Sequence, residues 1–115
     1  MTPDQFRQLA LSIPQAVESA HMNHPDFRLG GKIFASLGKP DEDWGMVKLS
    51  PEEQCDFMKQ SPKAFKPCAG AWGERGYTNV HLPSVTAKTL KSALTAAAQN
   101  IAASARKPSR SKRKL

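Results

Sequence analysis

Side chains that could do chemistry are concentrated between residues 21 and 37. Two histidines, an aspartate, an arginine and a glycine pair occur there: His21, His24, Asp26, Arg28, Gly30 and Gly31. Imidazole and carboxylate groups bind metals, but residues three apart on one strand project to opposite faces. His21 and His24 therefore converge only if the chain bends before Pro25. Because the cysteines that a structural zinc site favours are far away in sequence, we expect hydrogen-bonded turn histidines and no metal.

Nucleophilic catalysis would need a cysteine or a serine beside a histidine base and an orienting carboxylate. Cys55 falls in the middle of a predicted helix and Cys68 follows Pro67 on a predicted strand, so neither has a local activating group. The Gly30-Gly31-Lys32 run precedes a strand instead of a helix, and it therefore lacks the helix terminus of a phosphate loop. We expect no enzyme and no cofactor, and two buried reduced thiols instead of a disulfide.

Aromatic and basic side chains interleave on one face of the predicted strands. If the strands pair in an antiparallel sheet, the face opposite the apolar residues carries Lys32, Phe34, Lys48, Tyr77, Asn79 and His81. Rings that stack on bases and ammonium groups that neutralise phosphate are typical of nucleic-acid binding. Lys66 and Arg75 are further candidates for phosphate contact, with Phe34 and Tyr77 as the stacking residues. The alternative is an ordinary solvated or helix-covered face.

Two tryptophans lie near glycine-rich turns, and the sequence leaves their roles open. Trp44 and Trp72 are either edges of the core or stacking platforms.

The last ten residues carry most of the net charge of +7. Of the 17 lysines and arginines, six fall in 106–115, which leaves 11 basic against ten acidic residues in the rest of the chain. Such a cluster attracts any polyanion in a salt-sensitive way without reading sequence. The alternatives are a solubilising terminus, or docking on anionic lipid without aromatic anchors. The six residues are Arg106, Lys107, Arg110, Lys112, Arg113 and Lys114.

Helix signals that would position these groups occur at three places. Thr2-Pro3-Asp4-Gln5 and Ser50-Pro51-Glu52-Glu53 each combine an N-cap, a proline and a capping-box partner, which predicts helices from 2 to near 14 and from 50 to about 60. A third helix begins near Val85. Its apolar stripe follows spacings of 4, 3 and 4, at Leu90, Leu94, Ala97 and Ile101.

Strand signals occupy the segments between these helices. They predict strands at 16–22, 32–37, 44–49, 65–69 and 77–82, with turns at Pro25 and at the glycine pair. In 32–37 alternation places Ile33, Ala35 and Leu37 on the inner face and Lys32, Phe34 and Ser36 on the outer face. The order helix, three or four strands, helix, two strands, helix predicts an α+β domain with an antiparallel sheet and helices on one face.

The 21–37 block resembles the signature of the MmcQ/YjbR-like bacterial proteins. Segments 47–54, 62–67 and 70–73, with Gly76 and Thr78, extend the resemblance to about residues 3–100. It implies a secretion-chaperone-like or double-wing α+β fold, a DNA-binding function and no known catalytic residues. The basic tail departs from the pattern, since many relatives end soon after the last helix. Any DNA affinity of the tail would be particular to this chain.

We therefore expect one domain over 1–104 and a basic, disordered tail over 105–115. The mean hydropathy of −0.52 and the absence of an apolar run near roughly 20 residues argue against a membrane span. No secretory signal is evident, so we expect a cytoplasmic monomer that binds nucleic acid, preferably DNA, weakly and without catalysis. The alternative is a protein-interaction adaptor or chaperone-like module with an apolar patch on its open sheet face. A buried pocket enclosing His24, Asp26 and Arg28 would instead favour an enzyme.

Overall fold

Two helices begin at the capping boxes that the sequence predicts. In the computed structural model, which describes residues 1–21, 24–38 and 41–106, α1 spans Pro3–Leu11 and α2 spans Pro51–Gln60. The Thr2 hydroxyl accepts from the Gln5 N–H at 3.1 Å, and the Ser50 hydroxyl accepts from the Glu53 N–H at the same distance. The longest helix, α4 (Ala87–Arg106), and a short α3 (Ala71–Glu74) complete the helices. The sequence analysis did not predict α3.

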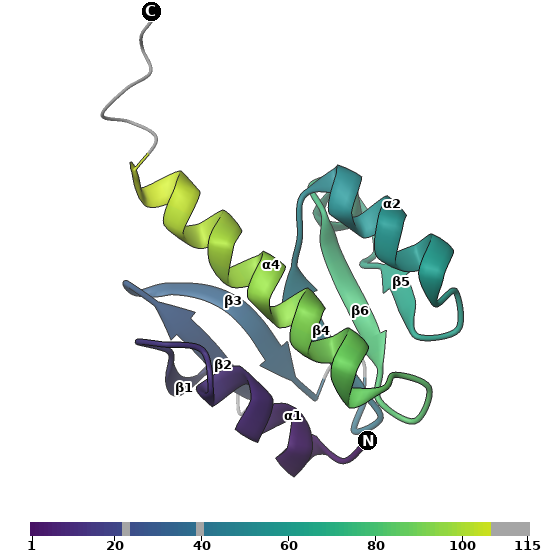
Figure 1. Cartoon of the computed structure of the whole chain (residues 1–115), viewed down its shortest axis with the longest axis horizontal. Helices are drawn as coiled ribbons and strands as arrows, with labels where there is room; N and C mark the ends of the chain where they lie inside the picture. The colour runs from purple at the N-terminus through teal and green to yellow at the C-terminus, as the bar shows by residue number, and fades with distance from the viewer. Residues whose placement is uncertain (22–23, 39–40, 107–115) are drawn as a thin grey trace, which may run out of the picture.

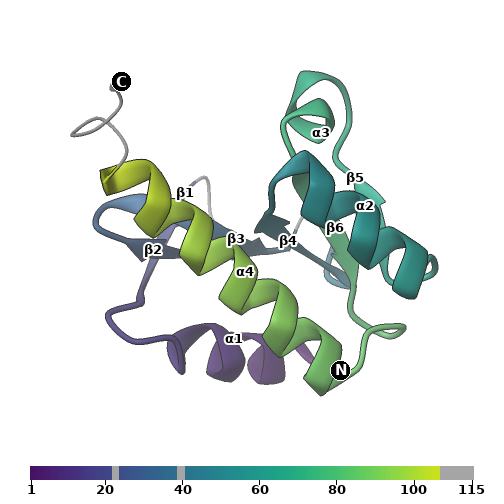
Figure 2. The ribbon, with the colours of Figure 1, turned by 45° about the horizontal axis from the view of Figure 1, so that its top comes forward.

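Six antiparallel strands form one open sheet in the order β1-β2-β3-β4-β6-β5. Helices α1, α2 and α4 lie on the same side of this sheet (Figure 1), and Figure 2 shows α4 crossing the strands above α1. The α+β class and the helices on one face are as predicted. The strands are β1 (Val17–His21), β2 (His24–Leu29), β3 (Lys32–Leu37), β4 (Trp44–Lys48), β5 (Phe65–Pro67) and β6 (Tyr77–His81).

The core lies between the sheet and these helices. The predicted stripe of α4 is buried, with Leu90, Leu94 and Ala97 fully inaccessible to solvent. From the sheet, Val47 and Val80 face it, and the largest buried side chains are four phenylalanines: Phe6, Phe27, Phe34 and Phe65. Burying apolar surface of this kind is the main favourable contribution to folding. It leaves the opposite face of the sheet free for polar and charged residues.

A β-bulge in β3 corrects the predicted side-chain pattern of this strand. Arg28 of β2 pairs with Ile33, but its neighbour Phe27 pairs with Ala35, so Phe34 is an extra residue in the ladder. A bulge places two successive residues toward the same side of the sheet. Phe34 is 0% exposed and belongs to the core, and the prediction of Phe34 as an exposed stacking residue is wrong. Ile33, predicted inside, is only partly buried and lies on the outer face.

The region around Pro25 also differs from the prediction. Pro25 lies inside β2 and not in a turn, and the antiparallel β1–β2 ladder brings His21 and His24 opposite each other. Residues 22–23, which connect the two strands, lie outside the described part of the structure. The turn at Gly30-Gly31 is confirmed, since both residues adopt positive φ angles of 57° and 82°.

The final helix continues past the predicted end of the domain at residue 104, because α4 ends at Arg106. Lys107, Arg110, Lys112, Arg113 and Lys114 of the predicted tail lie outside the described residues. None of the helices in the described ranges combines the length and apolarity needed to cross a membrane.

The bulge makes a testable prediction about Phe34. Phe34→Ala should lower the free energy of unfolding by about 3–5 kcal/mol, because it opens a cavity in the core. Tyr77→Ala, which truncates a half-buried ring on the outer face, should cost clearly less. Urea denaturation followed by circular dichroism measures both. Equal, small losses for the two variants would contradict the buried position of Phe34.

Candidate functional site

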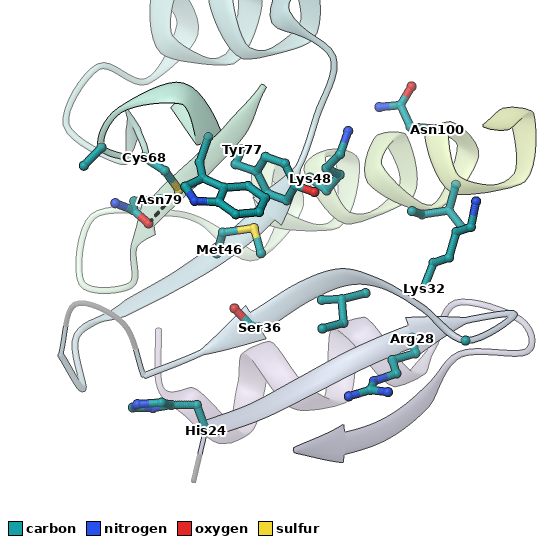
Figure 3. Close-up of a pocket in the computed structure, with 15 residues that line it drawn as sticks. His24, Arg28, Lys32, Ser36, Met46, Lys48, Cys68, Tyr77, Asn79 and Asn100 are labelled. Atoms are coloured by element: carbon teal, nitrogen blue, oxygen red, sulfur yellow. Dashed lines mark hydrogen bonds between the residues drawn. The ribbon is translucent and has the colours of Figure 1, made fainter. Parts of the chain in front are cut away.

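A groove of about 1100 Å³ crosses the sheet face that the core does not use. Its lining alternates along the strands with buried residues: Ser36, Met46 and Asn79 face the groove, whereas Ala35, Val47 and Val80 face the helices. The groove extends from β2 to β6 across four neighbouring strands. Figure 3 shows His24 and Arg28 on one side of the groove, with Lys48 and Tyr77 on the other.

Strands β3 and β4, which both line the groove, form only a short ladder. These strands pair only over Ala35–Leu37 and Gly45–Val47. Beyond that ladder, Lys32 and Lys48 stand on strands that are no longer paired to each other. Asn100 and Ile101 of α4 contribute to the lining, so the C-terminal half of this helix reaches the groove.

The lining of the groove includes His24 and three cations, Arg28, Lys32 and Lys48. None of the described residues in the lining is an aspartate or a glutamate. The acid next to Asn100 is Glu53, and its carboxylate is already engaged. Glu53 Oε1 accepts from the Asn100 amide at 2.6 Å and from the Ser50 N–H at 3.0 Å, as part of the α2 capping box. Asp26, which lies outside the lining, offsets the charge of Arg28, so Lys32 and Lys48 are the cations that give the groove its positive charge.

Arg28 is the most firmly positioned of these cations. Its Nε and Nη2 atoms donate to the two carboxylate oxygens of Asp26 at 2.8 and 3.1 Å. Asp26 is 0% exposed, whereas the Arg28 side chain remains 30% exposed at the groove. The hydrogen bonds to Asp26 raise the pKa of Arg28 further, although burial opposes the shift, so the guanidinium is always charged. A bidentate pair of this kind fixes the plane of the guanidinium.

Aromatic rings and cations alternate on the opposite side of the groove. Trp72 of α3 contacts Tyr77 of β6 edge to face, with 4.9 Å between ring centroids. Lys48 Nζ lies 5.0 Å from the centroid of the Tyr77 ring, and the Arg75 guanidinium lies 5.9 Å from that of Trp72. Trp72 is 57% exposed, which makes it a platform at the surface and not an edge of the core.

A second aromatic pair adjoins the groove at the start of β4. The rings of Trp44 and His81 are 4.7 Å apart, and Lys66 Nζ lies 5.8 Å from the centroid of Trp44. Lys66 is paired with Asn79, a groove residue, in the β5–β6 ladder.

The segment that carries Trp72 is held in place by α2 and by two glycines. The Gln54 amide nitrogen of α2 lies within 3.1 Å of the Gly73 and Tyr77 carbonyl oxygens and of the Thr78 hydroxyl. A Cβ atom at Gly73 would lie 2.0 Å from the Cys68 carbonyl oxygen, and one at Gly76 would lie 2.0 Å from that of Leu49. Only glycine permits this close packing. The Gly70–Gly76 stretch of the sequence thus positions the aromatic side of the groove.

Both cysteines are free, as expected, although only one is even partly buried: Cys55 is exposed on α2. Cys68 lines the groove, and its Sγ–H donates to Asn79 Oδ1 at 3.2 Å. Burial raises the pKa of the Cys68 thiol from 9.0 to about 11. The thiolate is the nucleophilic form, so Cys68 is a neutral hydrogen-bond donor near pH 7.

The structure brings Lys32, Lys48 and Tyr77 of the predicted site together in one groove, with Lys66 and Arg75 beside it. It excludes Phe34. Arg28 and Asn100 are not among the predicted nucleic-acid-binding residues, and the sequence leaves open whether Trp72 is a platform or a core edge. Alternation along a correctly assigned β2 would have found Arg28, because His24, Asp26 and Arg28 share one face of that strand.

The histidine-rich stretch does not assemble a metal site. Among the described residues, no three histidine, cysteine, aspartate or glutamate side chains lie close enough to hold a metal ion. His24 and Arg28 line the groove, which is open, and Asp26 lies beneath Arg28 outside the lining. The three residues therefore do not enclose a buried pocket.

Comparison with known proteins identifies the family. The family model described as YjbR matches residues 11–98, and the chain belongs to this family. The crystal structure of Deinococcus radiodurans protein DR2400, with the family domain DUF419, has a similar fold. Its TM-score is 0.73 at 18% identity, and the match covers 96% of this chain and 83% of that one. No curated protein matches this chain in sequence.

The Cys68 environment makes a prediction about pH. In Cys55→Ser protein, alkylation of native Cys68 by iodoacetamide should follow a pKa of about 11, and in urea it should follow the usual 9.0. Since the folded state holds this proton more tightly, its stability should be complete below pH 9 and should fall as the pH rises from 9 to 11. A native titration near pH 9 would contradict the buried, hydrogen-bonded thiol.

Proposed function

We propose that this protein binds nucleic acid, without catalysis, through the groove on the open face of its sheet. The observation that carries the proposal is the composition of the lining. Three cations, one of them paired with Asp26, and an exposed tryptophan platform converge on one concave surface, and none of the described residues that line it is an acid. Cations neutralise phosphates and supply most of the affinity, whereas rings interact with bases.

The size of the groove supports an extended ligand. Its volume of about 1100 Å³ lies slightly above the range of about 300–1,000 Å³ that is usual for small-molecule pockets. Lys66 and Arg75, which adjoin the groove, would lengthen the path of positive charge beyond it. Each of them also lies over an indole ring, so both are poised where stacked bases and phosphates alternate.

The basic C-terminal residues would add a non-specific attraction at one end of the groove. Asn100 lines the groove, and the same helix leads to Arg106 and to the five cations that follow in the sequence. Their contribution would be electrostatic and independent of base sequence.

The charge of the groove favours a nucleic-acid partner over a protein partner, although apolar atoms make up much of the lining. A contiguous patch of large exposed apolar side chains would mark a protein-binding face. The large exposed apolar side chains in the described ranges are Leu11, Val17 and Trp72, and only Trp72 lines the groove.

A charge-neutralising pair of variants tests the proposal. Lys32→Gln/Lys48→Gln should weaken binding of a fluorescent 20-mer and lower the slope of log K against log salt by about 1.5, since each lost phosphate contact removes about 0.7–0.9. Lys59→Gln/Lys88→Gln removes the same charge from exposed helix positions away from the groove and should leave the slope nearly unchanged. Fluorescence anisotropy between 50 and 200 mM salt measures both. If the two double variants behave alike, the groove is not the binding site.

Truncation after Arg106 separates the tail from the groove. The shortened protein should bind single strands and duplex with affinities lowered by a similar factor, and the Lys32/Lys48 effect should persist in it. Failure of the full-length chain to bind either form at low salt would overturn the proposed function.

A further inference from the structure

The two sides of the groove differ in chemistry, and this difference deepens the proposed function, on which it rests. We infer that the groove takes an unpaired, single-stranded segment. Its phosphates lie along the side built by β2 and β3, and at least one base stacks on Trp72 on the side built by α3 and β6.

The β2–β3 side is suited to a phosphodiester backbone. It carries Arg28 and Lys32, and no phenylalanine, tyrosine or tryptophan of these two strands lines the groove in the described structure. The guanidinium of Arg28 is fixed by Asp26 and cannot turn away from a ligand without breaking two hydrogen bonds. Asp26 uses two of the five N–H donors of this guanidinium, and the remaining donors, on Nη1 and Nη2, form a second edge that can bind phosphate oxygens.

The opposite side is suited to bases. Trp72 and Tyr77 stand nearly perpendicular, at 89°, so Tyr77 does not stack on the indole, and Trp72 is 57% exposed with the Arg75 guanidinium 5.9 Å from its ring centroid. A base that stacks there would have hydrogen-bonding side chains close by, because Asn79 and Ser36 also line the groove. The Cys68 thiol donates to Asn79 Oδ1. This hydrogen bond directs the donor end of the same amide, Nδ2, toward a ligand.

A duplex does not satisfy this arrangement. Its base faces are covered by neighbouring base pairs, and only base edges are accessible in the grooves, where a protruding helix or ribbon reads them. Here the protein surface is concave and the platform is a ring face, which only an unstacked base can reach. Single strands meet both requirements, since the backbone and the bases can turn to different sides.

The test uses the full-length chain with Trp44→Phe, so that Trp72 is the only tryptophan. Three ligands of equal length are compared by tryptophan fluorescence and anisotropy: oligo(dT), the same strand with abasic residues, and a duplex. Oligo(dT) should quench Trp72 and bind about 5- to 150-fold more tightly than the abasic strand, the range expected for one stacked base. The duplex should bind no better than the abasic strand.

Variants of Trp72 assign the effect to the platform. Trp72→Ala, in the natural Trp44 background, should bind oligo(dT) and the abasic strand equally, whereas Trp72→Phe should retain part of the difference. Leu11→Ala, another exposed apolar position, should behave as the unaltered protein. Equal binding of oligo(dT) and the abasic strand, or a preference for duplex, overturns the single-strand inference and leaves the proposed function standing. Absence of binding to all three ligands overturns both.

Discussion

One extra residue in β3 determines how this sheet divides its side chains between core and groove. With Phe34 inserted opposite the Phe27–Arg28 step, both Phe34 and Ala35 turn toward the helices, and Ile33 moves to the same face as Arg28. A regular strand would expose Phe34 and bury Ile33, because alternation has a period of two. The bulge therefore supplies the core with a large ring and places Ile33 beside Arg28 on the face that lines the groove.

The other side of the groove depends on packing between segments that are distant in sequence. The Gln54 amide connects α2 to the α3–β6 segment, and Glu53, one residue earlier, caps α2 and holds Asn100 of α4. Consecutive residues of one helix thus fix two borders of the groove. Glu53 keeps its negative charge beside the groove, and the two lysines of the lining, Lys32 and Lys48, outweigh it.

Local chemistry explains what could be predicted from the sequence. The structure confirms the capping boxes at Thr2 and Ser50 and the apolar stripe of α4. Each of these patterns depends on residues only a few positions apart in the sequence. The errors involve partners far along the chain. The bulge at Phe34 depends on how β3 pairs with β2. Pro25 is predicted in a turn, but it lies within β2, opposite Ala20 of β1. Likewise, Trp72 becomes a platform only because Gly73 and Gly76 let α3 pack against Cys68 and Leu49.

The edge strand β5 is poorly suited to pair with a strand of another chain. It spans three residues, carries the exposed Lys66, and ends at Pro67, which has no N–H to donate to a further strand. A short edge with a charge and a proline resists the addition of strands from other chains. The outer face of the sheet can therefore remain accessible while the β5 edge disfavours the addition of further strands.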